Sequence, residues 1–350
     1  MVPRARLVVM TLSAVLVPGA VGAYAADVDA AALARRLGFS AGERHVVARA
    51  PDGGSLSARA CGACHAEVYA DWVTTRHRAA WDNAVFQDGL AREPLPRCVH
   101  CHAPLAQQAS EIGALRGRTG RYEMRPERPV EAGLAHEGVT CAVCHVRDGV
   151  VLTTRSVRPD AYTPMHDIRV EPALKDPAFC AACHQFGFTD SAVLMQGTYD
   201  EWRAYRASGG EGTCQSCHMP GGRHLFRGAH DVELLRSSLT VRPDRTRDGF
   251  FLILESKGVG HHAPTGDLFR HYTVEAKVGD DFQDVARVGR TWGGEGLDKH
   301  VVEDTSLRPG VPLSVPLPPT TTSWRVRYHY AEARHERAGV ADPVVVAEGG

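Results

Sequence analysis

The sequence has no cysteine outside five short motifs, no excess of one charge and, beyond its first thirty residues, no long apolar run. The formal net charge of −1 argues against nucleic acid or an anionic membrane surface as the main partner. A membrane-spanning helix needs about 20 apolar residues, so we expect none in the mature chain. With 43% hydrophobic and 23% charged residues, the composition is that of a globular protein with one large or two ordinary domains.

The first 25 residues have the three parts of a cleavable secretory signal. Arg4 and Arg6 form a positive start, LVVMTLSAVLVPGAV is the apolar core, and Ala23-Tyr24-Ala25 is an A-x-A cleavage site. The alternative is an uncleaved anchor, but the apolar run is shorter than a membrane span requires. No cysteine follows the site directly, so a lipoprotein anchor is not indicated. We therefore expect cleavage after Ala25 and a periplasmic or extracellular protein.

All ten cysteines lie in pentapeptides of the form C-x-x-C-H. These are CGACH (Cys61–His65), CVHCH (Cys98–His102), CAVCH (Cys141–His145), CAACH (Cys180–His184) and CQSCH (Cys214–His218). Ten cysteines in an exported protein would normally indicate disulfides, but here every pair is followed by a histidine. With 18 histidines in 350 residues, this happens by chance on the order of once in a few million sequences.

Covalent attachment of haem c explains this spacing. Two thiols separated by two residues add to the vinyl groups on one haem edge, and the next histidine then reaches the iron. Zinc sites need no histidine after every cysteine pair, and redox C-x-x-C motifs normally occur singly. The sequence thus predicts five haems, attached through Cys61, Cys64, Cys98, Cys101, Cys141, Cys144, Cys180, Cys183, Cys214 and Cys217. The predicted proximal ligands are His65, His102, His145, His184 and His218.

The motifs start 37, 43, 39 and 34 residues apart, which indicates one haem for each short helical unit. About 180 residues that carry five haems have too little chain for an ordinary hydrophobic core. The porphyrins are therefore expected to form most of the core and to lie close together. Closely packed haems conduct electrons, so the motif region predicts electron transfer.

A bound haem iron has either a sixth ligand or an open face, and the other histidines are candidates for that ligand. His77 follows His65 by twelve residues on an expected helix, a rise of about 18 Å, so it should ligate a different haem. The other candidates lie in loops beside helix-breaking residues. They are His136, His166 and one of His224 and His230, of which His230 is preferred. For each of them a solvated or propionate-bonding position is the alternative.

Four distal candidates leave one haem without a partner, and the segment GVGHHAPTGD (258–267) offers the fifth. Either His261 or His262 could reach an iron from this loop. The segments around it are typical of β-structure: strands are expected at 250–256, 271–279, 311–317 and 324–331. PLPPTTTS is expected in an edge or loop, because proline cannot donate to a central ladder. This region predicts a β-sandwich, for which an Ig-like topology is the suggested form.

These motifs together resemble the cytochrome c-554 family of multihaem cytochromes c, within the wider hydroxylamine oxidoreductase-like group. The matching segments are CGACHAEVYADWVTTRH, HEGVTCAVCH, the His166 segment that runs into FCAACH, and CQSCHMP, and they cover roughly residues 55–232. The resemblance implies periplasmic electron transfer through parallel-stacked and perpendicular haem pairs. Some related proteins are enzymes with one five-coordinate haem. The chain departs from the four-haem pattern of the family by its fifth motif and its C-terminal extension.

Residues Gly260, His261, Pro264, Thr265 and Gly266 also resemble a Gly-His-x-x-Pro-Thr-Gly element of many multihaem cytochromes. In that element the histidine is a distal ligand, which implies His261 rather than His262. The expected fold is therefore a mainly α or irregular cytochrome domain with haems as its core, followed by an all-β domain. The expected parts are a signal peptide (1–25), an N-terminal segment (26–54), a pentahaem domain (55–235) and a β-sandwich (236–350).

The leading functional hypothesis is an exported electron carrier with mainly bis-histidine haems, which has no catalytic residues. Its partners are redox proteins whose identity the sequence does not reveal, and the oligomeric state is left open. One alternative is a reductase or oxidase of a small nitrogen or sulfur compound with one open haem, although no C-x-x-C-K motif occurs. The other alternative is a subunit of an extracellular cytochrome filament. Arg76, Arg78 and Arg223 are candidates to pair with haem propionates.

Overall fold

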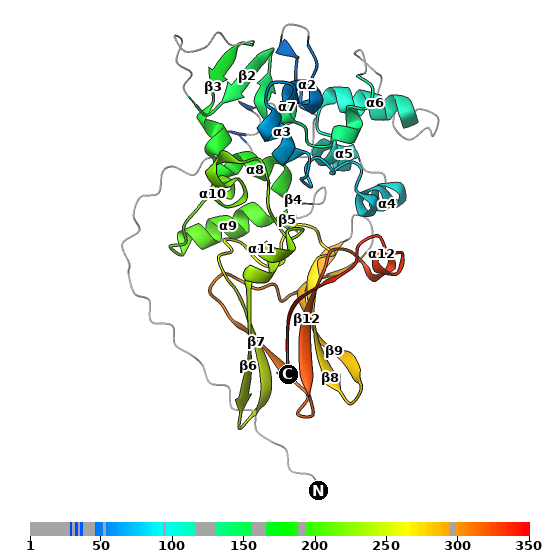
Figure 1. The fold of residues 1–350 in the computed structure, drawn as a ribbon, viewed down its shortest axis with the longest axis vertical. Coiled ribbons are helices and arrows are strands. Elements are labelled where there is room, and N and C mark those ends of the chain that lie inside the picture. Colours follow the sequence, from blue (N-terminus) through cyan, green and yellow to red (C-terminus); the bar gives the residue numbers. More distant parts are fainter. Residues whose placement is uncertain are drawn as a thin grey trace.

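The computed structural model describes residues 29, 32–33, 36–37, 46–51, 54–93, 96–116, 131–155, 166–187, 194–294 and 299–350. Figure 1 shows short helices gathered in one half of the molecule and long strands in the other. We call 46–237 the helical region and 238–350 the β-region. The expected signal peptide and its cleavage site lie outside the described residues, and the domain limits stay predictions.

The helical region is built from short helices and small sheets. The helices are α2 (Ala58–Gly62), α3 (Ala66–Trp72), α4 (Ala84–Arg92), α5 (Pro96–His102), α6 (Ala106–Arg116), α7 (Cys141–His145), α8 (Pro177–His184), α9 (Thr198–Ala207), α10 (Cys214–His218) and α11 (Val232–Ser237). The strands are β1 (Val146–Arg147), β2 (Val150–Thr153) and β3 (Ile168–Val170) in one sheet, and β4 (Gln185–Gly187) and β5 (Leu194–Gly197) in another. Three 3-10 helices, η2 (Ala135–Glu137), η3 (Pro172–Lys175) and η4 (Pro220–Gly222), connect them.

These helices are too short to be stable by themselves. Isolated helices below about 12–15 residues are marginal in water, and the longest described helix here has 11 residues. Neither α9 nor α10 has any buried residue. Among the described residues, none of the helices has the length and apolar character that a membrane crossing needs. Two clusters of buried apolar side chains pack between the other helices, one around Leu105 and Val143 and one around Trp81 and Leu90.

The helix expected to run from the first motif through His77 ends early. Helix α3 stops at Trp72, and the residues that follow form turns. The hydroxyls of Thr74 and Thr75 donate to the backbone carbonyls of Asp71 and Trp72, at 2.8 and 2.7 Å. Such bonds offer the backbone an alternative to the helical ladder, which explains the stop. His77 therefore lies on a turn and not on a helix.

The β-region contains two antiparallel sheets. Its strands are β6 (Leu239–Thr246), β7 (Gly249–Ser256), β8 (His271–Val278), β9 (Asp281–Gly293), β10 (His300–Asp304), β11 (Leu313–Leu317), β12 (Ser323–His329) and β13 (Val344–Gly349). The sheet orders are β10-β9-β8-β12-β13 and β11-β7-β6, and β11 is an edge strand. The four expected strands correspond to β7, β8, β11 and β12, whereas β6, β9, β10 and β13 were not predicted. Helix α12 (Ala333–Arg337) also interrupts a region expected to be all β.

One hydrophobic core joins the two sheets. The same cluster contains four fully buried side chains: Leu252 and Leu254 of β7, Val274 of β8 and Val326 of β12. Burial alternates along β7 as it should in a strand with one face on the core. A shared core of this kind is what two packed sheets require.

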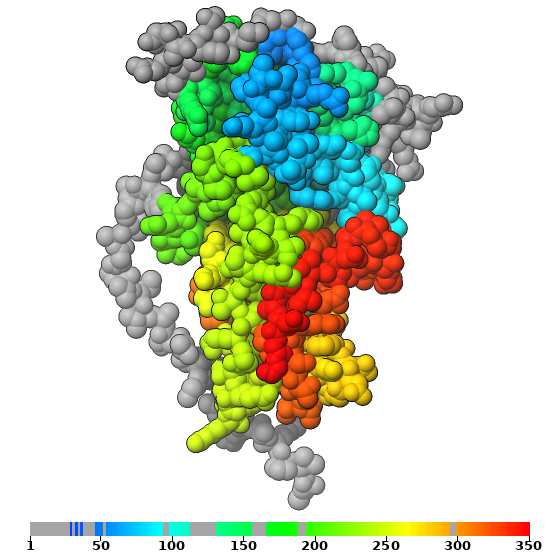
Figure 2. Space-filling view, viewed as in Figure 1, coloured from blue at the N-terminus to red at the C-terminus, as the bar shows by residue number. Residues whose placement is uncertain are grey.

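Ion pairs and hydrogen bonds hold the β-region against the helical region. Asp88 of α4 accepts from Arg334 and lies 3.1 Å from His335 Nε2, both on α12. Figure 2 shows this C-terminal segment in red against the cyan segment that contains α4. Hydrogen bonds from Arg92 and Arg334 hold the pKa of Asp88 well below its usual range. The unexpected helix α12 thus serves to dock the two regions.

Gly138 is the point where the chain before the third motif crosses the turn that carries His77. Its φ is +59°, and an added Cβ would lie 2.5 Å from the His77 carbonyl oxygen. Val139 N donates to the same oxygen at 2.9 Å, so the two segments cannot separate without losing that bond. Only glycine fits this approach.

We expect Gly138→Ala to lower the free energy of unfolding by at least the ~1–3 kcal/mol of a strained backbone, with the clash added. Guanidinium unfolding of the purified protein measures this. Gly149→Ala is the matched control, because Gly149 has a φ of +83° but no atom within 4 Å of an added Cβ. Equal losses in the two variants would show that the close approach to His77 contributes nothing.

Candidate haem-binding sites

Each C-x-x-C-H motif lies on or at the end of a short helix, in α2, α5, α7, α8 and α10. Side chains cap three of these helices: Ser57 caps α2, Asp176 caps α8 and Thr213 caps α10. Residues three apart share one face of a helix, so the two thiols of a motif point to the same side. All ten cysteines are free thiols, which thioether attachment requires.

Three of the motif histidines are oriented for metal binding through Nε2. Nδ1 of His102 bonds the carbonyl oxygen of Ala80 at 2.7 Å, and Nδ1 of His145 bonds that of Leu152 at 2.8 Å. His218 Nδ1 likewise bonds the carbonyl of Arg227. A carbonyl oxygen only accepts, so Nδ1 carries the proton and Nε2 keeps its lone pair. This arrangement is the usual second contact of a metal-ligating imidazole.

Four motif histidines face a second histidine from a distant segment. Metal–imidazole bonds are about 2.0 Å long and a ring centroid lies about 1.2 Å behind its nitrogen, so two axial imidazoles place their centroids about 6.4 Å apart. The observed centroid distances are 6.4 Å for His65 and His166, 6.2 Å for His77 and His184, 6.0 Å for His145 and His224, and 6.2 Å for His218 and His261. The donor set and its spacing therefore fit haem iron between each pair.

These pairs include three of the expected distal histidines, His77, His166 and His261. They also include His224, which the sequence offered only as the alternative to His230. The pairing further links each distal histidine with one motif, which the sequence could not do. His262, the alternative to His261, instead lies with its Nδ1 3.9 Å from Glu201.

Two expected distal histidines are placed elsewhere. His136 is 58% exposed and bonds Asp82 through Nδ1 at 2.6 Å. The His230 ring stacks on Tyr330 with centroids 4.4 Å apart. Among the ring contacts of the described residues, neither histidine faces a motif histidine. The preference for His230 over His224 therefore differs from the placement in the structure.

Asp71 of α3 fixes the position of His224. It accepts hydrogen bonds from Arg223, with Nε at 2.7 Å, and from the His224 backbone N–H at 3.1 Å. The hydrogen bond from Arg223 lowers the pKa of Asp71 below its usual value of 3.8. A depressed carboxylate pKa means that this contact stabilises the fold above pH ~4 and is lost only as the pH falls through the lower folded value. Arg223, a candidate to pair with a haem propionate, therefore donates to a carboxylate of the chain.

The loop 258–267 is docked on α9 of the helical region. Thr265 Oγ1 donates to a carboxylate oxygen of Glu201 at 2.6 Å, and it lies 2.8 Å from Thr198 Oγ1. The His262 backbone N–H donates to Glu201 at 3.1 Å. Gly260 lies so close to α9 that an added Cβ would be 3.0 Å from the Tyr205 ring. These contacts explain the positions of Gly260, His262 and Thr265 in the loop.

The second motif differs from the other four. The His102 ring stacks on Phe86 with centroids 3.6 Å apart and planes at 5°. Within the described part of the chain, no histidine ring faces His102 at the spacing of the four pairs. Burial lowers the pKa of His102, and the charge of Asp267, at the end of the docked loop, acts in the opposite direction.

Thiols of different motifs lie close enough to shift each other's pKa, which indicates which motifs are neighbours. The pairs are Cys61 with Cys141, Cys101 with Cys183, and Cys180 with Cys214. The first motif therefore lies beside the third, and the fourth motif lies beside both the second and the fifth. Cys144 acts electrostatically on Cys180 and Cys183, which links the third motif to the fourth. The hydrogen bond with Cys141 lowers the pKa of Cys61 to about 7.

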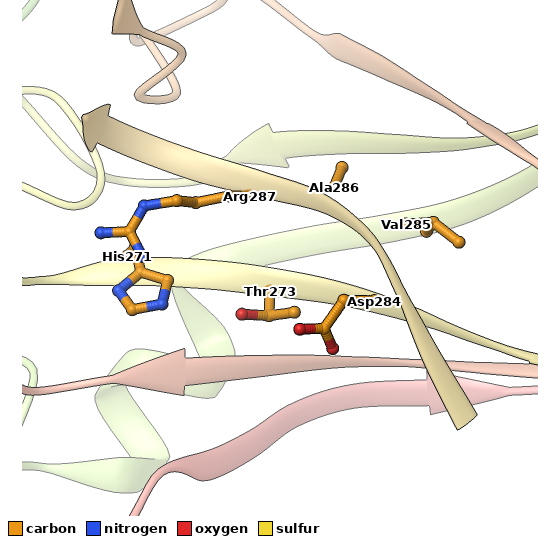
Figure 3. A pocket seen from close by; sticks show the side chains of 6 residues that line it. All are labelled: His271, Thr273, Asp284, Val285, Ala286 and Arg287. Carbon is orange, nitrogen blue, oxygen red and sulfur yellow. The ribbon is translucent and has the colours of Figure 1, made fainter. Parts of the chain in front are cut away.

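A pocket that contains no motif residue lies on the β-region. Figure 3 shows it lined by His271, Thr273, Asp284, Val285, Ala286 and Arg287, from β8 and β9. The His271 ring stacks on His329 with centroids 4.3 Å apart, too close for an iron between them. His329 is also engaged by Glu336 at 2.6 Å. These two histidines belong to the sheet.

Comparison with known proteins concerns the fold of the chain. The chain matches no protein-family model, and no curated protein matches it in sequence. It is similar in structure to a penta-haem cytochrome c552 from Thermochromatium tepidum, with a TM-score of 0.58. The fold is that of a multihaem cytochrome c. Sequence identity is 18%, and the match covers 83% of this chain and 97% of that chain.

Replacing His261 with alanine tests the ligand role of the docked loop. We expect His261→Ala to convert one haem from low-spin to high-spin, because its Nε2 would be lost while Glu201 still holds the loop. Visible and EPR spectra of the ferric protein measure this. His262→Ala is the matched control and should leave the spectra unchanged. A low-spin spectrum in both variants would refute the pairing of His261 with His218.

Asp71→Asn tests the positioning of His224. We expect a high-spin ferric component of up to one haem per chain, because the amide loses the charge-assisted bond to Arg223. Asp82→Asn serves as control, since Asp82 pairs with Arg78 and His136, neither of which faces a motif histidine. Identical EPR spectra of the two variants and the wild type would show that Asp71 does not hold His224.

Proposed function

We propose that this chain is an exported pentahaem c-type cytochrome that transfers electrons through closely packed, mainly bis-histidine haems. The observation that carries the proposal is the set of four opposed histidine pairs, each joining a motif histidine to a histidine far away in sequence. Haem c supplies reversible one-electron chemistry when bound. The residues of the chain attach it, ligate it and exclude water from it.

Cysteine pairs of the motifs would provide the thioether bonds and the motif histidines the proximal ligands. The distal ligands would be His166 for the first motif, His224 for the third, His77 for the fourth and His261 for the fifth. An iron held by both histidines of a pair would have no coordination position left for a substrate. Histidine in place of methionine as distal ligand also favours low reduction potentials.

The contacts between motifs support an electron path with one side branch. Thiol contacts run from the first motif to the third, and from the fourth to the fifth, with the third and fourth as neighbours. The second motif touches the fourth through Cys101 and Cys183 and therefore forms a side branch. Cys64 and Cys217 are exposed, so the first and fifth motifs are the expected ends at which redox partner proteins exchange electrons.

The β-region would then act as a β-sandwich, Ig-like in topology, that supplies a ligand loop to the cytochrome domain. Its two sheets with a common core support the sandwich. Its location outside the cytoplasm follows from the expected signal peptide, and haem c attachment suits the periplasm or cell exterior. The likeness of the motifs to the cytochrome c-554 family is part of the same proposal.

The second motif favours one further candidate function. A haem at the second motif with one open face would suit the reduction of a small nitrogen or sulfur oxyanion. The described residues bring no histidine ring opposite His102, and His45 lies outside them. The side-branch position also suits a terminal site better than a link in a chain. Electron transfer remains the better-supported function, because four of five motifs have both histidines in place.

EPR of the oxidised protein tests both proposals. We expect five haems per chain by mass and low-spin signals from four of them. A chain that takes up no haem, or three or more high-spin haems, would refute the carrier function.

A fifth, high-spin signal would support the open site. We expect Cys98→Ser/Cys101→Ser to remove that signal and leave the four low-spin ones. Cys214→Ser/Cys217→Ser, the matched control, should remove one low-spin signal instead. Five low-spin haems in the wild type would eliminate the reductase candidate.

A further inference from the structure

The pocket of the β-region lies on the outer face of the five-stranded sheet. Tyr272 and Val274 of β8 belong to the hydrophobic core, so Thr273 between them faces the other way. Thr273 is paired with Arg287 of β9, and both residues line the pocket. The volume of the pocket is about 310 Å³, at the lower end of the range for small-molecule sites. A ligand of this pocket is therefore small.

A β-bulge brings two opposite charges onto this face. The register of β8 and β9 shifts at Val285, which is an extra residue without a partner on β8. Asp284 and Arg287 are three positions apart and would lie on opposite faces of a regular strand. Because of the extra residue, Asp284 lies opposite Glu275 and Arg287 lies opposite Thr273, on the same face. Bulges re-aim side chains in this way.

These two charges are not neutralised by neighbouring side chains. The arginines on the same face of β12, Arg325 and Arg327, both donate to Glu275. Among the ion pairs of the described residues, none involves Asp284 or Arg287, although both line the same pocket. The pocket thus presents one anion and one cation that are paired neither with each other nor with a described neighbour.

A hydrogen-bond chain fixes the direction in which Thr273 donates. Nδ1 of His329 lies 2.6 Å from a carboxylate oxygen of Glu336, which only accepts, so Nδ1 carries the proton. Nε2 of the neutral ring then accepts from Thr273 Oγ1 at 3.0 Å. The hydroxyl proton of Thr273 is therefore used, and its oxygen offers lone pairs to the pocket.

His271 supplies a second neutral acceptor. Its Nδ1 donates to the carbonyl oxygen of Phe269 at 2.8 Å, so Nε2 keeps a lone pair. Burial lowers the pKa of His271 to about 4, and the ring is uncharged at neutral pH. Gly289, opposite His271, has a φ of +146°, and a Cβ there would lie 3.1 Å from the Cβ of His271. Arg287 is therefore the one cation among the side chains that line the pocket.

The lining groups match the two ends of a zwitterion. A guanidinium group binds a carboxylate through paired N–H donors. An ammonium group has three N–H donors and no acceptor, so it suits a carboxylate and a hydroxyl oxygen whose proton is already used. Figure 3 shows the Arg287 guanidinium extending toward His271, whereas the Asp284 carboxylate lies on the Thr273 side. A ligand with a single charge would leave one of the two lining charges without a partner.

We propose that this pocket binds an α-amino acid, with its carboxylate on Arg287 and its ammonium group on Asp284 and Thr273. Val285 and Ala286 also line the pocket and offer apolar surface to the side chain of the ligand. The site contains no cysteine or histidine of a C-x-x-C-H motif, so this inference goes beyond electron transfer.

Calorimetric titration of the holoprotein with L-alanine, L-valine and L-glutamine tests the site. We expect saturable binding of at least one of them, with a Kd of about 1 mM or lower. Arg287→Gln and Asp284→Asn should each weaken that binding at least tenfold, because each leaves one charge of the ligand without its partner. Arg287→Lys keeps the charge and should recover most of the affinity.

Matched control variants lie on the other sheet. Arg247 and Asp248 are exposed at the turn between β6 and β7. Arg247→Gln and Asp248→Asn remove the same two charges from this turn, and we expect the affinity for the amino acid to stay that of the wild type.

Two derivatives of the amino acid that binds test the zwitterion itself. The methyl ester lacks the carboxylate, and the N-acetyl derivative lacks the ammonium group. We expect each to bind at least tenfold more weakly than the free amino acid. Equal affinity of either derivative would overturn the proposal.

The inference also fails if none of the three amino acids binds the wild type at millimolar concentration, or if either Arg287→Gln or Asp284→Asn leaves the affinity unchanged. Both side chains are exposed, so we expect the variants to fold, which circular dichroism checks. Haem content and EPR spectra of the variants should equal those of the wild type. These two measurements distinguish failure of the amino-acid site from failure of the proposed function.

Discussion

The opposition of four motif histidines to histidines far away in sequence, with ring centroids about 6 Å apart, is the constraint that the long-range contacts of the helical region share. Helices as short as α10, with no buried residue, are marginal by themselves and are held by their contacts with the rest of the chain. The protein contacts that surround the pairs have one common effect, which is to bring a distant histidine opposite a motif histidine. Asp71 does so for His224, Gly138 allows it for His77, and Glu201 does so for the loop of His261.

The local part of this arrangement was predictable from sequence. A C-x-x-C-H motif carries its own chemistry within five residues, so thioether sites and proximal histidines need no knowledge of the fold. Alternating burial in β7 and β12 is local too, because side chains on a strand alternate between two faces. His261 could be preferred over His262 because of the resemblance of its loop to a known element.

The long-range part was not predictable. His224 and His230 lie six residues apart in equally polar surroundings, and the structure distinguishes them through Asp71, which lies about 150 residues earlier in the chain. His77 looked helical because Thr74 and Thr75 are tolerated in helices, and only their hydrogen bonds end α3. The sequence does not reveal which strands pair with β9 and β13. Helix α12 contacts Asp88 of the helical region, which lies far away in sequence.

The four histidine pairs also interleave along the chain. They span 65–166, 77–184, 145–224 and 218–261, and each span begins before the preceding one has ended. With iron bound between each pair, as proposed, such links would act like cross-links that close loops, and a loop of about 100 residues would restrict the unfolded chain by roughly 4.7 kcal/mol. Because every loop overlaps the next, breaking one link would also loosen the segment that the next link holds. Cooperative unfolding as one unit, rather than haem by haem, would be the consequence.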